Sequence, residues 1–101
     1  IHEDRVRLEL YRRLSKASEI QEVYKIEEEM EDRFGKPDVV TKQFIELIII
    51  KILALNLGIQ NISSYEMNIT FVSADNTKET IKSPSRDDDD IIATTLRYLR
   101  R

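Results

Sequence analysis

The chain opens with hydrophobic residues at helical spacing. Val6, Leu10 and Leu14 are four residues apart, so they fall on one face of a helix with 3.6 residues per turn. Charged residues fill most of the positions between them. This pattern predicts an amphipathic helix over about residues 4–16.

A second helical stripe follows after a short break. Ser18, with Gln21 three residues later, is typical of a capping box and predicts the start of this helix. Gly35 predicts its end, because glycine adopts the left-handed conformation at little cost, and Pro37 disfavours continuation. The stripe consists of Val23, Ile26, Met30 and Phe34.

The segment after Asp38 is apolar for most of its length. Asp38 is suited to cap a helix and Gly58 to end one, which leaves about eighteen residues between them. Isoleucine also favours strands, but a segment of this length is typical of a helix. Its apolar residues occupy nearly every helical face: Ile45, Leu47, Ile48, Ile49, Ile50, Ile52, Leu53 and Leu55. We therefore expect a central helix that is buried on all sides.

The spacing of apolar residues changes to two after Gly58. Strands are predicted near residues 61–65, 67–72 and 78–82, with a turn between the last two. Ser85 is expected to cap a final helix that ends near Arg100. Its inward stripe would be Ile92, Leu96 and Leu99.

The expected fold class is therefore α+β. It comprises three N-terminal helices with an apolar central helix, a small antiparallel sheet of two or three strands, and a C-terminal helix. A length of 101 residues fits a single domain over residues 1–101. Because the first residue is isoleucine rather than methionine, we expect this domain to be a fragment of a larger protein.

Composition narrows the function classes. The net charge is −3, which creates no strong field toward nucleic acid or an anionic membrane. The chain has no cysteine, which excludes disulfides and thiolate metal sites and fits a reducing compartment. The longest apolar run falls short of the roughly 20 residues that a membrane-spanning helix needs, so we expect no membrane segment.

No residue pattern indicates an active site. His2 is the only histidine and has no cysteine or second histidine to complete a zinc site. The serines stand in no nucleophile motif. Gly35 and Gly58 are the only glycines, so no glycine-rich phosphate loop can form. We therefore expect a non-enzymatic domain with no catalytic, cofactor or metal residues.

Two acidic clusters stand out. Residues 87–90 are four consecutive aspartates, which in a first helical turn stabilise the positive end of the helix dipole; a Ca²⁺ or Mg²⁺ site is the less favoured interpretation. The second cluster contains Glu29 and Asp32, which project side by side from the second helix. They are either a solvated face or a docking pair for basic groups on a partner. The basic first helix, with Arg12 and Arg13, is expected to pair with this acidic helix rather than to bind phosphate.

Three segments resemble the C-terminal domain of the bacterial transcription-repair coupling factors. The first is residues 7–14 (Arg-Leu-Glu-Leu-Tyr-Arg-Arg-Leu), and the second is residues 29–35 (Glu-Met-Glu-Asp-Arg-Phe-Gly). The third is residues 57–59 (Leu-Gly-Ile), at the end of the long helix. The resemblance weakens after Ile59. The loop at residues 36–38 is shorter than is usual in the family, the central helix is richer in isoleucine, and the chain ends soon after its last helix.

The resemblance implies a regulatory role. Members of this family are cytoplasmic DNA translocases that use ATP and Mg²⁺, push stalled RNA polymerase off lesions and recruit the excision-repair protein UvrA. The C-terminal domain docks on the UvrA-binding module of the same chain, masks it and restrains the motor. Glu29 and Asp32 match positions that face that module, and Glu28 and Arg33 flank them.

Two other functions stay open at the level of sequence. One is a nucleic-acid-binding accessory domain that uses the basic first helix and the arginines at the end of the chain. The other is a dimerisation module that uses apolar surface of the central helix. Without the resemblance, the residues support only an α+β interaction module.

Overall fold

The structure is a computed structural model that describes residues 2–101, with side chains from residue 4 onward. The side chain of His2 therefore lies outside the described residues. The chain divides into two units, one up to Ile52 and the other from Leu53 to Arg101. The single domain expected over residues 1–101 stays a prediction. No helix in the described part of the chain is long and apolar enough to cross a membrane.

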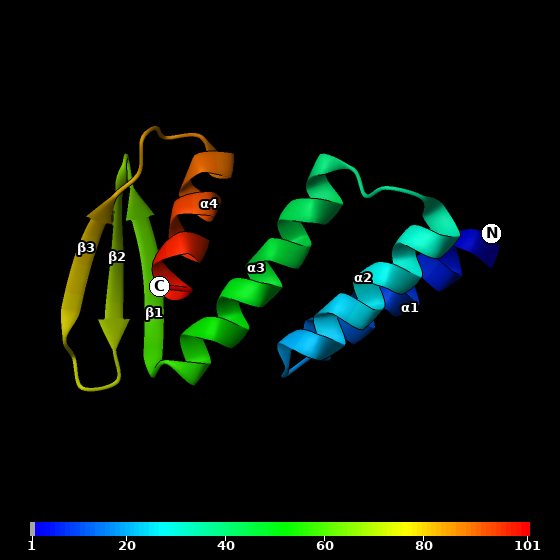
Figure 1. Ribbon diagram of the computed structural model, residues 1–101, viewed down its shortest axis with the longest axis horizontal. Coiled ribbons are helices and arrows are strands. Elements are labelled where there is room, and N and C mark those ends of the chain that lie inside the picture. Colours follow the sequence, from blue (N-terminus) through cyan, green and yellow to red (C-terminus); the bar gives the residue numbers. More distant parts are fainter. Residues whose placement is uncertain (1) are drawn as a thin grey trace. The chain divides into compact units, whose positions relative to one another are not determined.

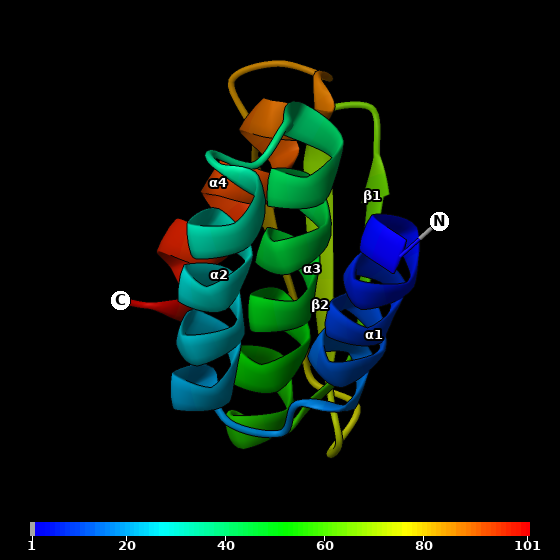
Figure 2. The same ribbon diagram turned by 90° about the vertical axis from the view of Figure 1, so that its right-hand side faces the viewer.

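The first unit consists of three helices, α1 (His2–Lys16), α2 (Ile20–Phe34) and the part of α3 (Val39–Asn56) that precedes Leu53. Figure 2 shows the three side by side, with α2 running antiparallel to both α1 and α3. The predicted apolar stripes supply the buried positions of α1 and α2, which confirms the helical patterns, although Val6 and Phe34 at the stripe ends are only partly buried. These buried residues are Leu10, Leu14, Val23, Ile26 and Met30.

The start of α2 differs from the predicted capping box. The N-cap is Glu19, whose backbone is extended (φ −130°, ψ 147°), and its side chain makes no capping hydrogen bond. The helix begins at Ile20, so the third helical residue is Glu22 rather than Gln21. The Ser18 hydroxyl donates to Glu22 Oε1 at 3.3 Å. The box with Gln21 is therefore wrong, because the helix starts later than the serine suggested.

The junction between α2 and α3 follows the sequence prediction closely. Gly35 ends α2 with φ +81° and ψ −166°, and its N–H donates to the Glu31 carbonyl at 2.8 Å. The positive φ is as expected, but ψ is extended rather than helical. Asp38 caps α3, because its Oδ1 accepts the Thr41 N–H at 2.8 Å. The hydrogen bonds from Thr41, the backbone one first, hold the pKa of Asp38 below its usual value.

The expectation that α3 is buried on all sides is wrong. Ile45 and Ile52 are each 2 % exposed, but Val40 is 75 % exposed, Leu47 51 % and Leu55 65 %. A helix is covered only where other elements pack against it, whatever the residues on its remaining surface. Apolar composition around the whole circumference therefore overstated the burial of this helix.

The second unit contains a three-stranded antiparallel sheet in the order β1 (Ile59–Tyr65), β2 (Asn68–Ser73) and β3 (Lys78–Lys82) (Figure 1). The alternation predicted for β2 is confirmed, since Ile69 is 0 % and Phe71 2 % exposed. The first strand begins two residues earlier than position 61, and its register with β2 shifts between Ile59 and Asn61. This irregularity hid the true start of the strand from an alternation pattern.

The last helix, α4 (Asp88–Leu99), lies on one face of this sheet (Figure 1). The Tyr98 ring stacks on Phe71 of β2, with 4.2 Å between ring centroids. The Tyr98 hydroxyl donates to Glu79 of β3. Burial and this hydrogen bond raise the pKa of the Tyr98 phenol. The predicted inward stripe is confirmed, because Ile92, Leu96 and Leu99 are all buried.

The predicted cap of α4 is wrong. The N-cap is Asp87, and it makes no side-chain capping hydrogen bond. Ser85 lies before the helix, where its Oγ accepts the Asp87 N–H at 3.0 Å and donates to Asp90 Oδ2 at 2.6 Å. The serine therefore shapes the turn that leads into the helix. Asp88, Asp89 and Asp90 occupy the first turn, where their charges oppose the helix dipole.

Candidate docking surface

Helix α2 presents the four residues that the sequence singled out. Glu28, Asp32 and Arg33 are exposed, and the side chain of Glu29 is 38 % exposed. All four lie off the stripe that α2 buries. The placement therefore leaves them accessible from solvent, while their role in docking stays a prediction.

Glu29 is held by an arginine from the neighbouring helix. Arg13 Nη1 donates to Glu29 Oε2 at 3.1 Å and to Glu29 Oε1 at 3.3 Å. Arg33, one turn along α2, places its Nε 4.0 Å from Glu29 Oε2. The expected pairing between the basic first helix and the acidic second helix is confirmed at this contact. Glu29 and Asp32 thus differ, since Glu29 is engaged with α1.

The other predicted cation of α1 pairs within its own helix. Arg12 Nη1 lies 3.1 Å from Glu9 Oε2, and both side chains are more than half exposed. Arg12 and Arg13, neighbours in the basic first helix, therefore have different partners. Both charges are met by carboxylates, which reduces the positive field that α1 offers to a polyanion.

A groove of about 400 Å³ runs beside the Arg13–Glu29 bridge, between α1 and α2. Val6 and Leu10 supply its apolar part, and charged side chains of both signs surround them. These charged residues are Arg5, Glu9, Arg13, Glu29 and Arg33. The bridge is therefore part of a mixed-charge rim, and Glu29 is not an isolated carboxylate.

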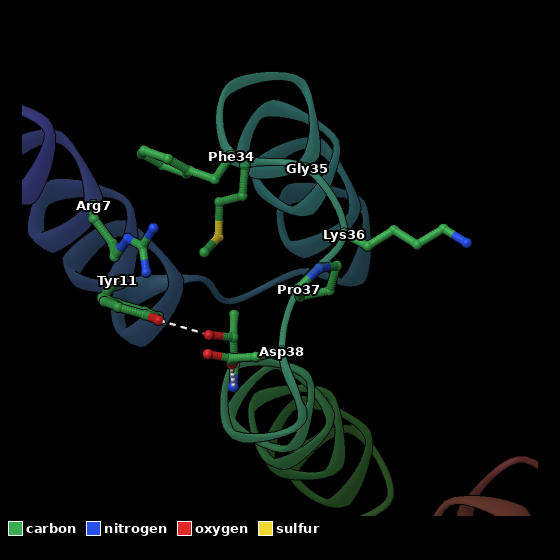
Figure 3. Close-up of a pocket in the computed structure, with 9 residues that line it drawn as sticks. Arg7, Tyr11, Phe34, Gly35, Lys36, Pro37 and Asp38 are labelled. Atoms are coloured by element: carbon green, nitrogen blue, oxygen red, sulfur yellow. Dashed lines mark hydrogen bonds between the residues drawn. The ribbon is translucent and has the colours of Figure 1, made fainter.

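A smaller hollow of about 140 Å³ lies where the three helices of the first unit meet (Figure 3). The Arg7 guanidinium stands over the Phe34 ring, 4.7 Å from its centroid. The hydroxyls of Tyr11 and Thr41 are 2.8 Å apart and hydrogen-bonded. These contacts tie the end of α2 to α1, and α1 to the start of α3. The sequence marked Phe34 only as apolar, so this anchoring was not predicted.

The two sides of α2 use their carboxylates differently. Glu27 is partly buried, and its burial, with the neighbouring charges of Glu31 and Glu46, raises its pKa, while Lys42 acts in the opposite direction. Glu27 therefore belongs to the packing of α2 against α3. Glu28, Asp32 and Arg33 in the C-terminal half of α2 stay exposed, as do Glu22 and Lys25 nearer its start.

The aspartates at residues 87–90 lie at the N-cap and in the first turn of α4. Asp90 is bonded to Ser85, and Asp88 and Asp89 lie in the first helical turn. Over the residues that the structure describes, no group of three or more His, Cys, Asp or Glu side chains is arranged to hold a metal ion.

Comparison with known proteins identifies the family. A family model described as the TRCF domain matches residues 1–83. The transcription-repair-coupling factor of Helicobacter pylori strain J99 is 50% identical over 99 residues, which cover 98% of this chain and 10% of that protein. The corresponding protein of Rickettsia prowazekii is 30% identical over 89 residues, which cover 85% of this chain and 8% of the relative. No solved structure matches this chain significantly.

The matches also show that this chain corresponds to a small part of the length of its relatives. The chain spans about 10% of the length of the Helicobacter pylori proteins, and strain 26695 gives the same 50% identity over 100 residues. The three helices and the sheet strands up to Lys82 all lie within the matched residues 1–83. The chain belongs to the TRCF domain family of the transcription-repair coupling factors.

Proposed function

We propose that this chain is a non-enzymatic regulatory interaction domain of a transcription-repair coupling factor. It docks on the UvrA-binding module of the same parent protein, masks that module and restrains the DNA translocase. The observation that carries the proposal is the exposed C-terminal end of α2, where Glu28, Glu29 and Asp32 lie off the buried stripe. Membership of the family supports it.

The mechanism is competition for one surface. The docked domain and UvrA would cover the same face of the module, so that release of one permits binding of the other. A switch of this kind requires a coupling free energy of only ~1–3 kcal/mol. Charged, partly exposed contacts suit that range, because exposed ion pairs typically contribute under ~1 kcal/mol each.

The rest of the parent would supply the chemistry. A motor outside this chain would use ATP and Mg²⁺ to translocate on DNA and act on stalled RNA polymerase in the bacterial cytoplasm. This domain would contribute no catalytic group, cofactor ligand or metal ligand. Its role would be to set how often the UvrA-binding module is accessible.

Charge reversal tests the proposal. Glu29→Lys with Asp32→Lys in the full-length parent would place like charges against the partner's basic surface, so the clamp should loosen and UvrA binding should rise. Basal ATPase should rise with it. The fold should be retained, because both side chains are partly or fully exposed and the Arg13–Glu29 bridge that the change removes is an exposed ion pair, typically worth under ~1 kcal/mol.

The matched control reverses two aspartates elsewhere. Asp88→Lys with Asp89→Lys makes the same change in charge on α4 and should leave UvrA binding unchanged. Thermal melting of both variants establishes that they fold. If the Glu29/Asp32 variant folds normally and binds UvrA as the unaltered parent does, the acidic end of α2 is a solvated face and the proposed docking is wrong.

The nucleic-acid alternative is less favoured by the contacts of α1. Arg12 is paired with Glu9 and Arg13 with Glu29, so neither presents an uncompensated charge to phosphate. Binding of DNA by the 101-residue chain that falls steeply with added salt would support the alternative.

A further inference from the structure

We propose that Arg13 is an internal competitor of the docking partner: it occupies the Glu29 carboxylate and thereby weakens the clamp. This inference rests on the proposed function, since it assigns a regulatory residue to the same surface. The observation that carries it is the geometry of one ion pair.

The position of the Arg13 nitrogen is the first argument. A single atom, Arg13 Nη1, lies 3.1 Å from Glu29 Oε2 and 3.3 Å from Glu29 Oε1, so it sits between the two oxygens. A partner arginine that formed a bidentate pair with this carboxylate would also have to reach both oxygens. Arg13 and such a partner arginine therefore compete for the same position in front of the Glu29 carboxylate.

The exposure of the bridge is the second argument. The Arg13 side chain is 46% exposed and that of Glu29 is 38% exposed. An ion pair this open to water is weak and exchanges readily. A docking partner can therefore displace Arg13 from Glu29. Breaking this ion pair costs free energy, however, and so weakens docking. Arg33 Nε, 4.0 Å from Glu29 Oε2, adds a second positive charge near the same carboxylate.

The consequence concerns the two members of the acidic pair. Asp32 is exposed, lies three residues along α2 and takes no part in the Arg13–Glu29 bridge. A basic group on the partner therefore approaches Glu29 in the presence of Arg13 and Asp32 outside that bridge. Asp32 should therefore contribute more to the affinity of docking than Glu29. Arg13 should determine how large the contribution of Glu29 is.

The experiment compares two arginines in the full-length parent. Arg13→Gln removes the competitor, whereas Arg12→Gln removes the same charge one residue away, from a bridge to Glu9 at 3.1 Å that does not involve Glu29. The readout is the Kd for purified UvrA. If the clamp is mostly closed, tightening it weakens UvrA binding by the same factor. Arg13→Gln should raise the Kd roughly two- to fivefold relative to Arg12→Gln, the range expected from one exposed ion pair.

A double variant shows whether Arg13 acts through Glu29. In the Glu29→Gln background, Arg13→Gln should have no more effect on the Kd than Arg12→Gln, because the carboxylate for which it competes is absent. Melting curves of all variants confirm that the changes reflect docking rather than unfolding.

The outcomes separate the two proposals. Equal Kd values for Arg13→Gln and Arg12→Gln, or a lower Kd for Arg13→Gln, would overturn the role of Arg13 while the Glu29/Asp32 reversal still loosens the clamp. An effect of Arg13→Gln that persists in the Glu29→Gln background would show that Arg13 acts on the partner directly, and would also overturn it. Failure of the Glu29/Asp32 reversal itself would remove the proposed function and this inference together.

Discussion

Gly35 offers a quantitative test of how α2 ends beside the proposed docking surface. Its backbone has φ +81° and ψ −166°, a region that is essentially reserved for glycine. A Cβ built at this position meets no heavy atom within 4 Å. Gly35→Ala therefore introduces backbone strain without a steric clash, so the two effects can be told apart.

The expected magnitude is the difference of two opposing contributions. Holding an L-residue in such a region costs ~1–3 kcal/mol. Alanine also restricts the unfolded chain, which stabilises the folded state by ~0.4–1 kcal/mol. Taking the middle of each range, the net loss in the free energy of unfolding should be about 1.3 kcal/mol.

Urea denaturation of the 101-residue chain measures this loss. With an m-value of ~2 kcal/mol/M, the midpoint should fall by roughly 0.6 M, and the slope should stay the same. Lys36→Ala is the control, since Lys36 is exposed and adjacent and should shift stability by less than ~0.5 kcal/mol. An alanine variant as stable as the parent chain would refute the positive φ at the end of α2.

Three further predictions concern stability. Leu14→Ala removes a fully buried side chain and should cost about 2–5 kcal/mol, whereas Leu8→Ala, at a position 64% exposed on the same helix, should cost under ~0.5 kcal/mol in the same denaturation assay. Because the pKa of Asp38 is lowered in the folded state, its stabilisation is complete above the unfolded-state pKa and is lost as the pH falls through the folded-state value. Asp38→Asn, which keeps the cap acceptor, should therefore show a shallower loss of melting temperature in acid. Asp88→Asn with Asp89→Asn should lower stability by ~0.3–1 kcal/mol each, and a saturable rise in the melting temperature of the unaltered chain at low Ca²⁺ would contradict this dipole role.

The helices could be predicted because their signals are local. The stripes of α1 and α2, the glycine stop at Gly35 and the cap at Asp38 each depend on residues within one or two turns. The wrong capping predictions concern Ser18 and Ser85. Both serines lie near a helix start and form hydrogen bonds there, but neither is the N-cap. A serine in the sequence locates a helix start only to within a residue or two, because serine can hydrogen-bond in the turn before a helix as well as at the N-cap.

The burial of α3 and the pairing of Glu29 could not be predicted in the same way. Leu47 and Ile45 are both apolar residues of one helix, yet one is 51% and the other 2% exposed. Which face is covered depends on where other elements lie. Likewise, the choice between Arg12 and Arg13 as the partner of Glu29 depends on the rotation of α1 against α2. Adjacent residues on a helix point about 100° apart, so only one of them can face the other helix.

The sequence by itself determined the order and type of the elements, the acidic end of α2 and the family resemblance, because periodicity, turn residues and short motifs are written along the chain. The tertiary structure decided which charged side chains pair within the chain and which stay exposed to a partner. It placed Arg13 of α1 on Glu29, left Arg12 with Glu9, and left Asp32 exposed. Contacts between residues 16 positions apart arise only when two helices pack, and packing is set by the shape of their buried faces rather than by the charged residues themselves.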